Sequence, residues 1–299
     1  KVEKMFSVQL EYFYTMARIS YVNGRYVPHS DASVHIEDRG FQFADAVYEV
    51  IAVQHGHLVD EDGHFDRLAR SLDELAIPQP MSKGALKLVI RELLRQNRVT
   101  FGALYMQVSR GQAPRDFPFP TDIAPTLVMS VKRLKPFDFE RTAQGVDVIT
   151  IPDIRWKRCD IKTVSLLAGA MGKTEAVSKG AFEAWQVDGD GMITEGTSSN
   201  AWIVTQAGEL ITRHTDHAIL GGITRQTVLK LAAAEGLNFV ERAFSVAEVK
   251  AAAEAFTSST TAFLRPVVRI DGKPIGTGEP GPFCLKLLEL YGLHMEKHP

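Results

Sequence analysis

The sequence is poor in cysteine. Its two cysteines, Cys159 and Cys284, lie far apart and show no metal-ligand spacing, so they predict neither a disulfide framework nor a zinc site. An excess of one charge is also lacking, because 34 basic and 36 acidic residues give a formal net charge of −2. This balance does not suggest binding to nucleic acid or to an anionic membrane. We expect a protein of a reducing compartment, with the cytoplasm as the default.

Long hydrophobic runs are absent too. No apolar run approaches the roughly 18 residues that a membrane-spanning helix needs. Residues 1–15 lack the charged start, long apolar centre and small-residue cleavage site of a signal peptide. The stretch M-A-R-I-S-Y-V-N-G reads like a natural start at Met16. We therefore interpret residues 1–15 as an upstream or expression-derived extension and exclude them from the functional reasoning.

Several common enzyme motifs are missing as well. No G-x-G-x-x-G follows a predicted strand, and neither a P-loop nor a G-x-S-x-G motif occurs. The first two motifs bind dinucleotides and nucleotide phosphates, and the third carries the nucleophile of many serine hydrolases. The sequence therefore does not support these three classes of enzyme. It also suggests no metal site.

The composition is that of a globular protein, with 45% hydrophobic and 23% charged residues. A chain of 299 residues is long enough for two domains. The polar segment 136–145 interrupts the pattern of strands and helices, so we predict a linker there. It separates a smaller N-terminal α/β domain, residues 16–135, from a larger C-terminal domain, residues 146–299.

The first part predicts a mixture of strands and helices. Asn23-Gly24 is the strongest short hairpin signal. Apolar residues at three- and four-residue spacing predict one helix over 64–77 and another, capped by Ser82, that runs to Gln96. Strands are predicted at 104–109 and 126–131, and four prolines between residues 114 and 125 predict a fixed irregular loop between them.

The second part predicts strands and helices in alternation, without a long parallel run. Helices are predicted near 165–179, from Ile223 to Gly236, after a capping box at 245–248, and over 282–297. Strands are predicted at 146–151, 182–187, 201–205, 209–212 and 255–258, followed by a hairpin through Asp271-Gly272. The fold class is therefore α+β, a mixed α/β protein in two parts.

Lys162 is the first candidate for chemistry. It stands in R-W-K-R-C-D-I-K-T, just before a helical pattern. A lysine is a useful nucleophile when desolvation or nearby positive charge lowers its pKa from about 10.4. Arg155, Lys157 and Arg158 are close in sequence, and apolar residues follow. We interpret Lys162 as the residue that bonds to pyridoxal phosphate, an electrophilic cofactor; taken alone, the segment also fits an ordinary surface lysine.

Glu195 is the second candidate. It ends a predicted strand in T-E-G-T-S-S-N. A carboxylate is the partner that a protonated pyridine nitrogen requires, and small neighbours let the backbone approach a cofactor. The same residues are also typical of a turn whose hydroxyls satisfy their own backbone.

Three features predict a phosphate site. Two glycines precede the helix in L-G-G-I-T-R at 220–225, so the amides of Ile223 and Thr224 are expected at its N-terminus. S-S-T-T at 258–261 offers four hydroxyls. Arg67 is a candidate for a two-point contact with the phosphate. Each feature alone also fits an ordinary cap, turn or solvated arginine.

Together these segments resemble the fold-type IV pyridoxal-phosphate enzymes, and most closely the D-amino-acid aminotransferases. The resemblance runs from about Ile19 to the C-terminus and rests on D-I-R-W-K-R-C-D-I-K-T, E-G-T-S-S-N, G-I-T-R and T-S-S-T-T, in that order. It implies that Lys162 is the Schiff-base lysine and the general base. It implies cofactor contacts from Arg67, Glu195, Thr197, Ser198, Asn200, Leu220, Ile223, Thr224 and Thr260. It further implies a homodimer in which a partner loop reaches the substrate site between the domains.

The resemblance is less complete at the substrate site. V-Y-E-V at 47–50 is similar to the D-amino-acid branch and makes Tyr48 a candidate for binding the substrate carboxylate. That branch has an R-x-H motif on the loop between strands, whereas this chain has Arg115-Asp116-Phe117. Arg115 can still bind a carboxylate, but Phe117 replaces one hydrogen-bond donor by an apolar ring. The family's F-G-D-G is here F-A-D-A at 43–46, and alanine has a less permissive backbone.

The predicted activity is a transamination between D-amino acids, such as D-alanine and D-glutamate, and 2-oxo acids such as 2-oxoglutarate. An (R)-selective amine transaminase and an aminodeoxychorismate lyase share the same cofactor residues and stay open as alternatives. Phe117 favours the first of these. From a different class, a non-catalytic binding protein with a structural lysine is disfavoured by the presence of both Lys162 and Glu195.

Overall fold

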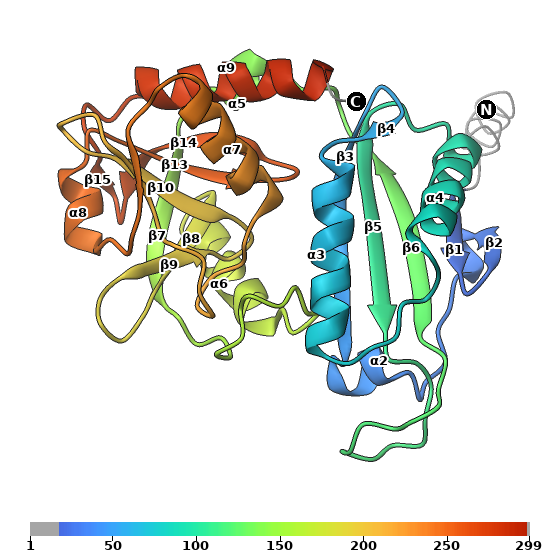
Figure 1. The fold of residues 1–299 in the computed structure, drawn as a ribbon. Helices are drawn as coiled ribbons and strands as arrows, with labels where there is room; N and C mark the ends of the chain where they lie inside the picture. Colours follow the sequence, from blue (N-terminus) through green and yellow to red (C-terminus); the bar gives the residue numbers. More distant parts are fainter. Residues whose placement is uncertain (1–17, 298–299) are drawn as a thin grey trace, which may run out of the picture.

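The strands form two separate sheets in the computed structural model, which describes residues 18–297 (Figure 1). The interpretation of residues 1–15 as an extension lies outside these residues. Strands before residue 134 make up the first sheet, and strands after residue 145 make up the second. Each sheet packs with its own helices in one of two lobes, so the predicted mixed α/β class is confirmed.

The first sheet has six antiparallel strands in the order β2-β1-β6-β5-β3-β4. Asn23 and Gly24 connect β1 to β2 with φ values of 43° and 88°, the positive values that a two-residue hairpin turn requires. The predicted hairpin is confirmed. The strands are β1 (Ile19–Val22), β2 (Arg25–Pro28), β3 (Ala46–Gln54), β4 (His57–Leu58), β5 (Gly102–Ser109) and β6 (Thr126–Arg133).

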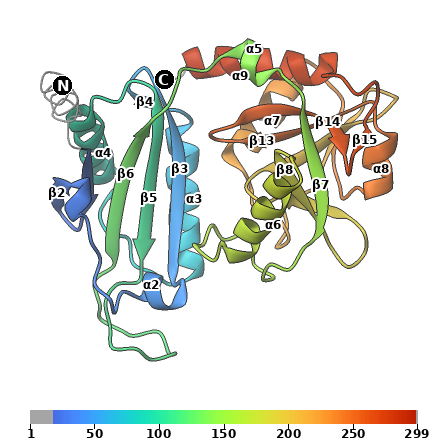
Figure 2. The ribbon, with the colours of Figure 1, turned by 180° about the vertical axis from the view of Figure 1, so that it is seen from behind.

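Two amphipathic helices, α3 (Glu61–Glu74) and α4 (Lys83–Asn97), cover one face of this sheet. Their buried leucines and isoleucines pack with the inward residues of β3, β5 and β6, as the periodicity predicts. Ser82 caps α4 by accepting a hydrogen bond from the Ala85 amide. Helix α3 ends earlier than predicted because Ala76 takes a φ of 49°. Figure 2 shows the opposite face of β3, β5 and β6, which no helix of residues 18–297 covers.

A short helix and a long loop lie at one end of this sheet. Helix α2 (Arg39–Phe43), which the sequence did not predict, is capped by the Asp38 carboxylate. It ends at Ala44, whose φ of 55° is in the left-handed region. The loop 110–125 forms neither a helix nor a strand, and Figure 1 shows it extending below the sheet. The predicted irregular loop is confirmed.

The second sheet is mixed and has nine strands. Its path is β12-β11-β10-β13-β14-β7-β8-β9, with β15 paired to β14. Pairs β11–β12, β14–β7 and β7–β8 are parallel and the others are antiparallel. The strands are β7 (Val146–Pro152), β8 (Glu183–Val187), β9 (Ile193–Gly196), β10 (Asn200–Val204), β11 (Leu210–Thr212), β12 (Phe239–Glu241), β13 (Glu254–Ser259), β14 (Phe263–Ile270) and β15 (Lys273–Pro274).

Helices cover both faces of the second sheet. Helices α7 (Ile223–Ala234) and α9 (Pro282–Lys297) pack over Trp202 and Phe256, whose rings stack with centroids 5.3 Å apart. Helix α8 (Val246–Ala251) packs on the other face and begins with the predicted capping box of Ser245 and Glu248. Helix α6 (Leu167–Ser178) contacts β7 and β8 and lies on the side that faces the first lobe (Figures 1 and 2).

The segment between the two sheets is not wholly irregular. It contains the short helix α5 (Phe139–Thr142), which Asp138 caps and which buries Thr142 against α9 and β14.

The two lobes are also joined by polar contacts. The Asp60 carboxylate accepts a hydrogen bond from Thr227 over 3.0 Å and lies 2.7 Å from His294 Nε2. None of the helices within residues 18–297 has the length and apolar character to cross a membrane.

Candidate active site

One pocket between the lobes brings most of the predicted site residues together. Its wall contains strand, loop and helix residues that are far apart in sequence. The predicted site residues that line it are Tyr48, Arg67, Lys162, Glu195, Thr197, Ser198, Asn200, Leu220, Ile223, Thr224 and Thr260. Arg115 and Phe117 do not line it.

Lys162 lies where the two lobes meet. Its carbonyl oxygen accepts a hydrogen bond of 2.9 Å from the Tyr48 amide, and Val164 donates back to Ala46 over 3.1 Å. Its ammonium nitrogen lies 4.3 Å from the ring centroid of Tyr48. Burial, together with the positive charge of Arg67, lowers the pKa of Lys162 to about 8. A pKa near neutrality is what a lysine needs to accept and return protons.

The source of the positive charge differs from our expectation. Arg155 and Arg158 are close to Lys162 in sequence, but both form ion pairs with carboxylates. Arg67, which is distant in sequence, is the arginine that acts on Lys162. The expected lowering of the pKa is therefore present, but packing between the lobes supplies the charge.

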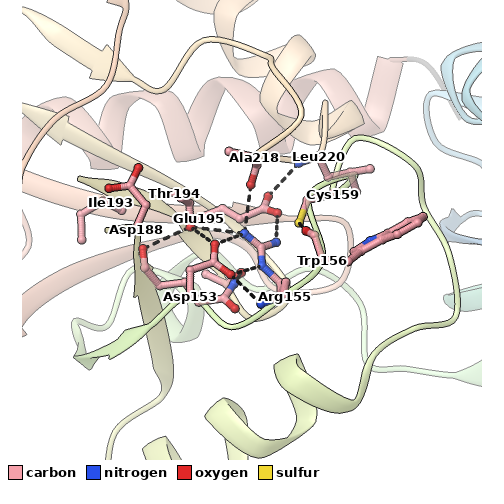
Figure 3. A network of polar contacts seen from close by, with 12 residues as sticks. Asp153, Arg155, Trp156, Cys159, Asp188, Ile193, Thr194, Glu195, Ala218 and Leu220 are labelled. Carbon is pink, nitrogen blue, oxygen red and sulfur yellow. Dashed lines mark hydrogen bonds and ion pairs between the residues drawn. The ribbon is translucent and has the colours of Figure 1, made fainter. Parts of the chain in front are cut away.

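Glu195 lies in β9 with donors on both carboxylate oxygens. Oε2 accepts hydrogen bonds of 3.1 Å from the Asn200 side chain and from the Leu220 amide. Oε1 accepts from the guanidinium of Arg155 (Figure 3). Burial raises the pKa of the Glu195 carboxyl, and Arg155 and the Leu220 amide act against that rise.

The N-terminus of α7 opens on the same pocket, as the predicted phosphate site requires. Gly222 is its N-cap residue, so the amides of Ile223 and Thr224 belong to the first turn and lack partners within the helix. A Cβ atom at Gly222 would lie 2.1 Å from Oδ1 of Asn200. Glycine is therefore required here because the helix start and the Glu195 region approach closely.

Arg67 is held at the pocket by a buried cluster. Its guanidinium donates to both oxygens of Glu49, over 2.8 and 2.7 Å, and to the carbonyl of Gly221 over 3.1 Å. His64 Nδ1 lies 2.7 Å from Glu49. These contacts, the charge of Arg67 first among them, lower the pKa of Glu49 to about 2 against the cost of its burial. Glu49 thus fixes Arg67 at the pocket wall.

The hydroxyls after Glu195 are bound by a second glutamate. Thr197, Ser198 and Ser199 all donate to the carboxylate of Glu183, which is buried in β8. Since their hydroxyls are committed to Glu183, Thr197 and Ser198 offer backbone and carbon atoms to the pocket. The small residues that we expect to let the backbone approach a ligand thus lie in the pocket wall.

Arg115 and Phe117 lie on the exposed loop 110–125 instead. The Arg115 guanidinium is 5.2 Å from the ring centroid of Phe43. Phe117 is 77% exposed and packs edge-on against the same ring. The loop is held by Arg39, which donates to the carbonyl of Asp116 over 2.7 Å. Within a single chain, these two residues are not part of the pocket.

Three functional neighbours escaped the sequence analysis: Glu49, Glu183 and Arg155. The two glutamates leave a readable signal, because each is the only charged residue of its strand. The sequence gives no signal that Arg155 is the partner of Glu195, since Arg155 stands among other cations in R-W-K-R. Among residues 18–297, no group of three histidine, cysteine, aspartate or glutamate side chains is placed to hold a metal ion.

Solved structures with this fold include aminotransferases. The branched-chain amino acid aminotransferase of Escherichia coli aligns with a TM-score of 0.86 at 25% identity, over 95% of this chain and 96% of that one. The branched-chain aminotransferase of Thermoproteus uzoniensis with norvaline aligns with a TM-score of 0.80 at 25% identity, over 94% of this chain and 97% of that one. Another branched-chain enzyme, solved with pyridoxamine 5'-phosphate, aligns with a TM-score of 0.86 at 24% identity. The fold and the lysine-bearing pocket together define an aminotransferase.

Sequence comparison gives the family. The model of the amino-transferase class IV family matches residues 46–270. D-alanine aminotransferase of Bacillus licheniformis is 42% identical over 87% of this chain and 91% of that protein. D-alanine aminotransferase of Staphylococcus aureus (strain N315) is 38% identical over 93% of this chain and 98% of that protein. The chain belongs to the class IV aminotransferases, whose substrates are an amino donor and a 2-oxo acid.

Proposed function

We propose that this chain moves amino groups between D-amino acids, such as D-alanine and D-glutamate, and 2-oxo acids such as 2-oxoglutarate, with pyridoxal 5'-phosphate as cofactor. The observation that carries the proposal is that Lys162 and Glu195 face one pocket, the first with a lowered pKa and the second surrounded by donors. The similarity to D-alanine aminotransferases supports the choice of D-amino acids.

The residues present fit this cofactor. Pyridoxal phosphate has an aldehyde, a basic ring nitrogen and a phosphate, and the pocket offers a different partner for each. Lys162 supplies an amine for the aldehyde, and Glu195 supplies an acceptor for a protonated ring nitrogen. Arg67 and the first turn of α7, together with the hydroxyls of Thr224 and Thr260, suit the phosphate. Leu220 supplies an apolar contact for the ring.

When bound, the cofactor supplies an aldehyde for amines and a ring that withdraws electrons from the substrate Cα. Lys162 acts as the general base that takes the Cα proton, because its pKa of about 8 leaves part of it uncharged at neutral pH. Glu195 binds as a carboxylate and favours a proton on the ring nitrogen. Tyr48, whose ring lies over Lys162, holds that amine within the pocket.

Substrate recognition involves Tyr48 and, we further propose, a second copy of the chain. Arg115 and Phe117 lie outside the pocket of their own chain, so they serve a substrate site only if the loop 110–125 enters the pocket of a partner. The uncovered face of the first sheet and exposed apolar residues support a homodimer (Figure 2). The exposed apolar residues near the loop and α6 are Phe41, Phe117, Phe119, Leu166, Leu167 and Met171.

The remaining assignments follow the same proposal. We divide the chain into an N-terminal domain, 16–135, a linker, 136–145, and a C-terminal cofactor domain, 146–299, because the sheets divide at that linker. The cytoplasm is the compartment proposed, since Cys159 and Cys284 are both free thiols.

An (R)-selective amine transaminase is the second candidate, favoured by Phe117. An apolar ring in place of a histidine removes a donor for a carboxylate and adds a contact for an apolar amine. The two functions differ in whether the substrate carboxylate is needed.

The test is an amine panel on the protein reconstituted with pyridoxal phosphate. D-alanine, L-alanine and (R)-1-phenylethylamine are each supplied with 2-oxoglutarate, and glutamate formation is measured. We expect D-alanine to be the best donor. If only L-alanine reacts, the D-amino-acid assignment is wrong, and if only the arylamine reacts, the second candidate replaces the first.

Matched lysine variants test the cofactor assignment. Lys162→Ala is expected to abolish the visible absorption of the lysine-bound cofactor and the activity. Lys157→Ala, an exposed lysine of the same segment, should change neither. A visible band that survives Lys162→Ala unchanged would remove Lys162 from its assigned role.

A further inference from the structure

Arg155 lies at the centre of a polar network that includes Glu195 (Figure 3). Asp153, at the end of β7, binds one edge of its guanidinium, with 2.9 Å from Nε to Oδ1 and 2.7 Å from Nη2 to Oδ2. This two-point contact fixes the plane and direction of the group. The opposite edge, Nη1, then points to Oε1 of Glu195.

Further contacts prevent Arg155 from turning. Its Nη2 donates to the Ala218 carbonyl over 3.0 Å and to the Thr194 hydroxyl over 3.2 Å. Thr194 in turn donates to Asp153 over 2.7 Å. The side chains of Asp153, Arg155 and Glu195 are 11%, 14% and 8% exposed, so water competes little with these bonds.

The donors around Glu195 determine what the carboxylate can still bind. A carboxylate has about four acceptor sites, two on each oxygen. Asn200 and Leu220 use both sites of Oε2, and Arg155 uses one site of Oε1. One acceptor site remains, on the oxygen that Arg155 contacts. Three donors to one carboxyl group favour its ionised form, because a carboxylate accepts and cannot donate.

We propose that Arg155 is a positioning residue that holds Glu195 as a carboxylate and leaves one acceptor site for the ring nitrogen of the cofactor. Asp153 orients Arg155 for this task. The inference rests on the proposed function, since it concerns the same cofactor. Without Arg155, only two neutral donors would remain to stabilise the buried charge of Glu195. The proton between the ring nitrogen and Glu195 would then move to Glu195.

Other charged groups face Glu195 and bear on the same proton. Lys162 and Arg155 favour the carboxylate. Burial raises the pKa values of Tyr48 and Cys159, and the charge of Glu195 adds to the rise. Of these groups, Arg155 is the one with a direct bond to Glu195, so its loss should have the largest effect.

The experiment places nitrogen-15 in the pyridine ring of the cofactor and records its resonance in the holoenzyme at neutral pH. The wild-type protein is expected to show a protonated ring nitrogen. Arg155→Gln should move the resonance towards the position of a deprotonated ring nitrogen. Glu195→Gln, which has no carboxylate partner for that nitrogen, gives the reference for complete loss of the ring proton. We also expect kcat to fall by roughly 10- to 100-fold, the range found for groups that orient a metal ligand.

The controls separate charge, geometry and folding. Arg158→Gln removes a nearby arginine that pairs with Glu74 and Asp160 and should leave the resonance unchanged. Arg155→Lys keeps the charge but cannot bind Asp153 at two points while contacting Glu195, so its resonance should lie between those of wild type and Arg155→Gln. A wild-type resonance in either Arg155 variant overturns the inference. A wild-type protein that binds no labelled cofactor, or binds it unprotonated, counts instead against the proposed function.

Discussion

The ammonium nitrogen of Lys162 lies 4.3 Å from the ring centroid of Tyr48, although the two residues come from different lobes. The backbones meet as well, since the Tyr48 amide donates to the Lys162 carbonyl over 2.9 Å. The lysine of the pocket is therefore fixed by both halves of the chain. A change in how the lobes pack would alter the environment that lowers its pKa.

The lowered pKa of Lys162 predicts a pH-dependent stability of the cofactor-free protein. The pKa is about 8 in the folded state and about 10.4 in the unfolded state. Between these values the unfolded state binds more protons, so the contribution of Lys162 to stability rises with pH. Below pH 8 the buried charge is destabilising. Lys162→Met should then raise the free energy of unfolding by roughly 1–3 kcal/mol.

The stability gained by Lys162→Met should shrink as the pH approaches 10. Denaturant unfolding of the wild-type and Lys162→Met proteins, both freed of cofactor, measures the difference at each pH. A difference that does not change between neutral pH and pH 10 would show that Lys162 titrates normally.

The buried ion pair of Glu49 and Arg67 predicts a large loss of stability when its carboxylate is removed. Glu49→Ala leaves Arg67 without its partner, and breaking a buried ion pair costs about 3–5 kcal/mol. Affinity for the cofactor should also fall, because Arg67 is no longer fixed at the pocket. Glu61→Ala removes one partner of the more exposed Lys87 and should cost less than about 1 kcal/mol.

The stabilisation that this pair supplies should also depend on pH. The pKa of Glu49 is lowered to about 2, so its contribution is fully present above the unfolded value of about 4.3. It is lost as the pH falls towards 2. Denaturant unfolding of wild-type and Glu49→Ala proteins gives the contribution at each pH. Equal costs for Glu49→Ala and Glu61→Ala at neutral pH would contradict the pairing.

The position of Arg115 predicts complementation between two inactive chains. If the loop 110–125 serves the partner, a mixed dimer of Lys162→Ala and Arg115→Ala chains contains one site with both residues intact. Mixing equal amounts of the two variants under conditions that exchange subunits should therefore restore activity with D-glutamate at one site of each mixed dimer, which is about one site in four overall. If activity does not return although co-purification of differently tagged chains shows mixed dimers, Arg115 does not act across the dimer.

Ala44 predicts a simple stabilising change. Its φ of 55° is in the left-handed region, which costs an alanine about 1–2 kcal/mol relative to glycine. Ala44→Gly should raise the free energy of unfolding by roughly 0.5–1 kcal/mol, after the larger entropy of the unfolded glycine chain is subtracted. Ala46→Gly, in buried strand β3, should be destabilising, and thermal unfolding of both variants measures the contrast. Equal shifts would mean that Ala44 is unstrained.

The sequence predicted most helices and strands because their signals are local. Asn23-Gly24, the Ser82 cap and the capping box at Ser245 each depend on a few neighbouring residues, and each has its predicted conformation. Helix α2 was missed because five residues are too short for a periodic pattern. Its stability comes from the Asp38 cap and from the bonds of Arg39 to Asp45 and to the distant Asp116 carbonyl.

For the pocket, the sequence by itself identified most of the residues that gather there, although Arg115 and Phe117 lie outside it. Lys162, Glu195 and the start of α7 each lie in a local sequence motif, and all of them line the same pocket. Only the tertiary structure decided which groups act on them. Arg67 rather than Arg158 lowers the pKa of Lys162, and Arg155 rather than Lys157 reaches Glu195. The physical reason is that a motif specifies backbone conformation over a few residues, whereas an ion pair depends on distances between atoms that chain folding alone brings together.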